Sequence, residues 1–277
     1  MTLCLSWKRN NTIHFSSDSR VSTDEESYAD IGIKVMEIPV IINGPRDFNT
    51  GIERTVYNYK IGISYCGSTV TAHLLKETIS EVLLNLQVLP DSDSFSFEGI
   101  CNVVKLFFER TAEELINGAD LEPDIEFLLG GYCPQHQEVL VYKFDLIEID
   151  NVSFEVIFDR VLEENEEYIA LGSGAGNAEN ILNTLEEIPD NKYLKVLKQI
   201  CKDENVPSVG GFLQYGKFQN NNFKVYGVQD YIQNDNGGLE FIYPFRGTIL
   251  YENDLNIRDL GFHIAANFIQ PFEDEVF

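Results

Sequence analysis

The sequence predicts an α+β fold: a four-layer αββα sandwich, with two packed β-sheets covered by helix pairs and extra strands at the C-terminal end. The main observation is the order of the expected elements, which runs strands, two helices, strands, two helices, strands. Alternating βα units would instead predict a doubly wound sheet. The second observation is a content of 44% hydrophobic and 12% aromatic residues in 277 positions, enough for a substantial buried core.

The chain is expected to begin with a β-hairpin. Residues 3–7 and 12–16 are short strand-like runs, and the polar cluster 8–11 between them suits a tight turn. Further strands are expected at 31–42 and 57–66, where apolar and β-branched residues gather.

Four helices are expected, in two pairs. Apolar residues keep a helical period in 68–86 and again in 97–116. The second pair covers about 174–188 and 193–203, interrupted at Pro189. Strand-like segments lie between the pairs at 125–130, 137–144, 153–158 and 168–171, and again after 210. With no repeat and no linker, we expect one domain over 2–233, with an elaboration over 234–277 packed on it.

Charge and cysteine content narrow the function classes. The 45 acidic and 20 basic residues give a net charge of −25, which repels phosphate backbones and anionic lipid. We therefore expect neither nucleic acid nor membrane partners. The five cysteines form an odd set without a secretory context, which favours free thiols and a cytoplasmic location. Cys133 and His136 make only half of a zinc site, so no metal or cofactor is expected.

Several residues with reactive or polar side chains occur in a defined order and spacing along the chain. A threonine follows Met1, an Asp-x-Arg lies in the second expected strand, and a lysine follows in the next one. A glycine precedes the first long helix, and Gly-Ser-Gly opens the third. These positions are Thr2, Asp18, Arg20, Lys34, Gly67 and Ser173. The pattern resembles the proteasome β-subunit family, HslV-like, of the N-terminal-nucleophile (Ntn) hydrolases of the threonine class. The resemblance covers roughly residues 2–229.

The resemblance implies an active site at the start of the chain. Thr2 would become the nucleophile once Met1 is removed, with its own α-amine as the base. Lys34 would lower the pKa of that amine, whose ordinary value is about 7.7–8.0. Asp18 would pair with Lys34 and orient it, and the N–H of Gly67 would donate to the oxyanion.

The resemblance also implies a network on the amine side. Ser173 would hydrogen-bond the Thr2 amine and help to carry its proton. The family has an aspartate after the fourth helix, and here the segment carries extra residues. Asp203 matches by its place after the helix, whereas Asn205 matches if Ser208 is taken as the anchor. We favour Asp203 and keep Asn205 as the alternative.

Substrate binding is expected at four positions. Arg20, Val21, Met36 and Tyr65 stand where the resemblance implies substrate contacts. The last three of these imply an apolar P1 site rather than an acidic one.

The function expected from these residues is a threonine-type peptidase or amidohydrolase that acts through an acyl-enzyme on Thr2. Two alternatives remain open: a transpeptidase or small-amide hydrolase of the same fold, and a catalytically silent subunit used for assembly or binding. The resemblance implies a peptide or protein substrate and self-association, and it allows for a regulatory ATPase or cap as a partner.

Overall fold

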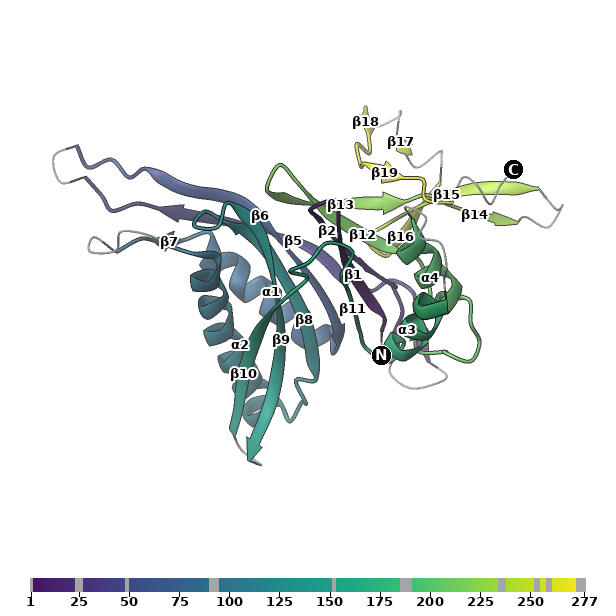
Figure 1. Ribbon diagram of the computed structural model, residues 1–277, viewed down its shortest axis with the longest axis horizontal. Coiled ribbons are helices and arrows are strands. Elements are labelled where there is room, and N and C mark those ends of the chain that lie inside the picture. Colours follow the sequence, from purple (N-terminus) through teal and green to yellow (C-terminus); the bar gives the residue numbers. More distant parts are fainter. Residues whose placement is uncertain are drawn as a thin grey trace.

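The fold is a four-layer α+β sandwich (Figure 1). The computed structural model describes residues 2–22, 27–47, 50–89, 95–150, 153–184, 191–233, 238–251, 255–257 and 261–272. One six-stranded sheet has the order β11-β1-β2-β12-β13-β19, and the other has the order β10-β9-β8-β6-β5-β7. Helices α1 and α2 cover the second sheet, and α3 and α4 cover the first.

The helices are α1 (Thr69–Leu83), α2 (Phe97–Ala119), α3 (Ala175–Thr184) and α4 (Lys192–Cys201). The strands up to α3 are β1 (Cys4–Arg9), β2 (Thr12–Ser17), β3 (Val21–Ser22), β4 (Tyr28–Ala29), β5 (Val35–Asn43), β6 (Thr55–Gly67), β7 (Leu86–Gln87), β8 (Ile125–Cys133), β9 (Glu138–Asp150), β10 (Ser153–Val161) and β11 (Tyr168–Leu171). The strands after α4 are β12 (Gln214–Gln219), β13 (Asn222–Val228), β14 (Asp230–Gln233), β15 (Leu239–Phe245), β16 (Thr248–Leu250), β17 (Asn256–Ile257), β18 (Phe262–His263) and β19 (Phe268–Ile269).

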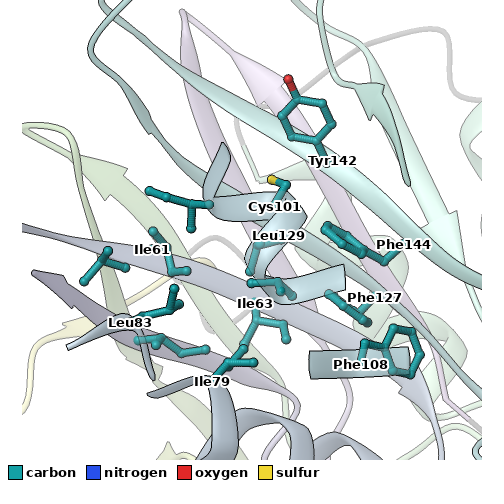
Figure 2. Packing of buried hydrophobic residues seen from close by; sticks show 14 of the residues in the cluster. Ile61, Ile63, Ile79, Leu83, Cys101, Phe108, Phe127, Leu129, Tyr142 and Phe144 are labelled. Atoms are coloured by element: carbon teal, nitrogen blue, oxygen red, sulfur yellow. The ribbon is translucent and has the colours of Figure 1, made fainter. Parts of the chain in front are cut away.

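Three buried clusters correspond to the three interfaces between the layers. The largest lies between the β5–β10 sheet and helices α1 and α2, and Figure 2 shows Ile63, Ile79 and Phe127 packed within it. A second cluster joins the other sheet to α3 and α4. The third lies between the two sheets, where Phe15 of one sheet packs with Leu128 of the other. Alternating side chains of each inner strand therefore serve two different cores, as a sheet covered on both faces requires.

The expected hairpin at the start of the chain is confirmed. Strands β1 and β2 pair antiparallel from Cys4 with Ser17 to Arg9 with Thr12. The two turn residues, Asn10 and Asn11, have φ angles of 49° and 58°. Asparagine tolerates this left-handed conformation, which the tightest hairpin turns need at both central positions.

The strand expected at 31–42 starts later than predicted. Strand β5 begins at Val35, and residues 31–34 form a loop. The N–H groups of Lys34 and Val35 donate to the side chain of Gln214. The N–H of Lys34 is therefore not available to a neighbouring strand, and the pairing of β5 with β6 starts at Val35.

The unusually long interval between Lys34 and Gly67 is occupied by two long strands. β5 and β6 pair from Val35 with Ser64 out to Asn43 with Thr55, and β7 joins the outer end of β5. Figure 1 shows this hairpin, here called the β5–β6 arm, extending well beyond the rest of the sheet.

The C-terminal strands contact the main body at several points. Strand β19 pairs in parallel with β13 and so extends the first sheet. The ammonium group of Lys198 on α4 lies 2.7 Å from the carboxylate of Asp230 and 3.8 Å from the ring centre of Phe272. We propose that residues 2–233 and the elaboration over 234–277 form one domain; residues 234–237 lie outside the described part. No helix in the described part of the chain is long and apolar enough to cross a membrane.

Candidate active site

A buried ion pair lies at the centre of the candidate site. The ammonium nitrogen of Lys34 lies 3.0 Å from Oδ1 of Asp18, and the two side chains are 1% and 0% exposed. The same Oδ1 accepts the N–H of Leu3 at 3.0 Å. Oδ2 accepts the N–H groups of Arg20 at 3.0 Å and Gly210 at 3.2 Å. Four donors therefore compensate the cost of burying this carboxylate.

Thr2 is linked to this pair through the next residue, Leu3. The bond from Leu3 to Asp18 fixes the residue that follows Thr2, and Thr2 itself is only 1% exposed. The carbonyl oxygen of Thr2 also accepts a weak hydrogen bond of 3.5 Å from the hydroxyl of Ser173. The start of the chain is thus bound to both β2 and the loop before α3.

Gly67 ends β6 in a conformation that favours glycine. Its φ angle is +98°, and a β-carbon there would lie 2.3 Å from the carbonyl oxygen of Asp124. The following N–H, from Ser68, donates to that same oxygen at 2.6 Å. Ser68 then caps α1 through its side chain, which accepts the N–H of Thr71. Gly67 therefore stands at a sharp turn between a buried strand and a helix start.

Ser173 is joined to Ser208 and not to the predicted acid. The two hydroxyl oxygens lie 2.8 Å apart. The carboxylate of Asp203 instead accepts the backbone and side-chain N–H groups of Asn205, at 2.9 and 2.8 Å. Asp203 and Asn205, the two alternatives from the sequence, therefore bond to each other. Ser208 is the residue that contacts Ser173.

The four predicted substrate-binding residues lie in different environments. Val21 in β3 is half-buried, whereas Met36 and Tyr65 are buried in the core under α1. The guanidinium of Arg20 bonds both carboxylate oxygens of Asp30, at 2.8 and 3.1 Å. These hydrogen bonds raise the pKa of Arg20 above its ordinary value. Arg20 thus binds Asp30, ten residues further along the chain.

Sequence reasoning missed one polar residue at the centre of the site. Gln214, the first residue of β12, is 3% exposed and hydrogen-bonds to the segments that carry Asp18 and Lys34. The available signal was an amide in the otherwise apolar run from Phe212 to Tyr215, just after two glycines. Within the described residues, no group of three or more His, Cys, Asp or Glu side chains is arranged to hold a metal ion.

Solved structures of Anbu share this architecture. The helical assembly of the Anbu complex from Pseudomonas aeruginosa aligns with a TM-score of 0.54 and 14% identity, over 81% of this chain and 85% of that one. The chain shares its fold with Anbu. A Gly-1 mutant of Anbu from Hyphomicrobium sp. strain MC1 aligns with a TM-score of 0.53 and 12% identity, over 81% and 84% of the two chains. No protein-family model matches the sequence, and no curated protein matches it significantly.

These findings correct the family assignment made from the sequence. The chain is not identified as a proteasome β-subunit of the HslV-like, N-terminal-threonine type, because the structures it resembles are Anbu complexes and no family model matches. What the comparisons show is that the chain shares its fold with Anbu.

Proposed function

We propose that this protein is an N-terminal-threonine hydrolase that cleaves amide bonds of peptides through an acyl-enzyme on Thr2. The observation that carries the proposal is the buried Lys34–Asp18 pair, whose carboxylate also binds the N–H of the residue after Thr2. A buried cation beside a hydroxyl and an amine suits nucleophilic catalysis, because it lowers the pKa of the amine and stabilises developing negative charge.

The proposed reaction begins with cleavage of the Met1–Thr2 bond, which frees the α-amine. The hydroxyl oxygen of Thr2 attacks the substrate carbonyl carbon, and its proton passes to the amine. The N–H of Gly67 donates to the oxyanion while Lys34 supplies positive charge. The C–N bond then breaks, the leaving amine takes the proton, and water hydrolyses the ester to regenerate the threonine.

Ser173 has a supporting role in this proposal. Its hydroxyl lies between the Thr2 carbonyl, at 3.5 Å, and the Ser208 hydroxyl, at 2.8 Å. We propose that Ser173 and Ser208 together relay the amine proton. Asp203, which accepts the N–H groups of Asn205, would help to fix the conformation of the loop that carries Ser208.

The proposal is tested by hydrolysis of a mixture of N-capped peptide coumarylamides by the processed protein. We expect Thr2→Ala to reduce the rate at least about 10³-fold and Thr2→Ser to stay within about tenfold of the wild type, because serine keeps the hydroxyl. Added hydroxylamine diverts the acyl group if an amine can resolve the ester, which would favour a transpeptidase. Equal rates for the wild type and Thr2→Ala would exclude Thr2 as the nucleophile.

We also propose that the chain self-associates. One of the Anbu structures with this fold is a helical assembly. In this chain, Ile52 and Leu89, 68% and 73% exposed, place large apolar side chains on or beside the β5–β6 arm. Light scattering after size exclusion is expected to give a multiple of 31.5 kDa. Ile52→Glu should lower that mass, whereas a wild type that is monomeric at high concentration would contradict the proposal.

A further inference from the structure

The Gln214 side chain uses both ends of its amide at the candidate site. Its oxygen accepts the N–H groups of Lys34 at 2.9 Å and Val35 at 3.3 Å. Its nitrogen donates to the carbonyl oxygens of Asp18 at 3.2 Å and Gly32 at 2.6 Å. At 3% exposure, no part of this amide depends on solvent for its hydrogen bonds.

These four bonds connect segments that belong to different sheets. Asp18 follows β2, and Lys34 precedes β5 of the other sheet. Gln214 begins β12, where it pairs with Ser17 next to Asp18. The amide therefore bridges the two sheets at the point where Asp18 meets Lys34.

An ion pair between two sheets is sensitive to small shifts of one sheet against the other. The Lys34–Asp18 distance is 3.0 Å, and both groups are withdrawn from water. The Gln214 amide fixes the backbone on both sides of the pair, so it sets where the Lys34 ammonium stands relative to Asp18 and to the start of the chain. A hydrocarbon side chain of the same length could fill the space but would leave two N–H donors and two carbonyl acceptors without partners.

We infer that Gln214 is a positioning residue for the nucleophile. It holds Lys34 where its charge lowers the pKa of the Thr2 α-amine and so keeps the base unprotonated at neutral pH. This inference rests on the proposed function. It assigns to Gln214 a role that acts through Lys34 and not through contact with the substrate.

The test compares Gln214→Met with Gln219→Met, a matched change at the exposed far end of the same strand. In each processed protein, the α-amine pKa is measured by competitive acetylation as a function of pH, and adduct formation with a β-lactone is followed in parallel. We expect Gln214→Met to raise the amine pKa by about one unit and to slow adduct formation at pH 7 by about tenfold or more. Gln219→Met should leave both unchanged.

A purely structural role for Gln214 predicts a different pattern. Gln214→Met would then lower the melting temperature without moving the amine pKa, and that result would overturn the inference. If Gln214→Met does not fold, Gln214→Asn serves instead, because its shorter amide can keep one pair of bonds; the pKa rise should then be smaller but present. A wild type that forms no adduct, yet whose amine pKa rises on substitution of Gln214, would overturn the proposed function and leave the positioning role standing.

Discussion

Replacing Lys34 by methionine is expected to produce the largest combined loss of stability and reactivity in this protein. The substitution keeps an unbranched side chain out to the ε-carbon, but it removes the ammonium group and leaves the Asp18 carboxylate buried without its cation. Removing one partner of a buried ion pair lowers the free energy of unfolding by about 3–5 kcal/mol. We expect a loss of about 3 kcal/mol here, because three backbone N–H groups still donate to the Asp18 carboxylate. Adduct formation at Thr2 should fall at least about 100-fold, because the positive charge beside the amine is gone.

The matched control is Lys60→Met. Lys60 also forms an ion pair, at 2.5 Å with Glu37, but its side chain is 48% exposed. An exposed pair contributes about 0–1 kcal/mol, so we expect little change in stability and none in reactivity. Urea unfolding gives the first quantity, and the rate of adduct formation gives the second. Similar losses of stability and reactivity in both variants would mean that the buried Lys34–Asp18 pair contributes no more than an exposed ion pair.

Gly172→Ala is expected to displace Thr2, because Gly172 lies against the Thr2 carbonyl group. Gly172 has a φ angle of +90°, and an added β-carbon would lie 2.2 Å from the carbonyl oxygen of Thr2. The left-handed conformation alone costs about 1–2 kcal/mol for alanine, and the contact requires the start of the chain to move. Since a displacement of about 1 Å can lower a rate 100-fold, adduct formation should fall steeply.

Gly176→Ala is a control a few residues further along the same segment. Gly176 lies inside α3, and a β-carbon there would have no heavy atom within 4 Å. Gly176 is the second residue of α3, where alanine has the better helix propensity but gains less than in a helix interior, so this variant should be at least as stable and fully reactive. If Gly172→Ala labels as fast as Gly176→Ala, the position of Thr2 in this structure does not determine its reactivity.

The sequence predicted the architecture well because its strongest signals are local. A polar turn with two asparagines specified the first hairpin, and apolar periodicity specified α1 and α2. The ends of elements were less predictable. The strand expected from residue 31 begins at Val35, and the N–H of Lys34 just before it binds Gln214, 180 residues further along the chain.

The candidate site was predictable in part. The resemblance to a known family implied that Asp18 pairs with Lys34, and the structure pairs them. The partner of Ser173 depends on how the loop after α4 folds. The structure pairs its hydroxyl with that of Ser208, and a part for Asp203 or Asn205 in the amine-side network stays a prediction. The family assignment was wrong because it rested on the intervals between a few residues, whereas the solved structures that share this fold are Anbu structures and no family model matches the sequence.

The most direct test of the central claim is the intact mass of the purified protein, expressed without an N-terminal tag, before and after an epoxyketone probe. We predict a chain that lacks Met1 and gains one probe mass, with the adduct mapped to a peptide that begins at Thr2 and absent from Thr2→Ala. A chain that retains Met1, or a processed chain that never gains the probe mass, would contradict the account and leave an Anbu-like scaffold without a working nucleophile.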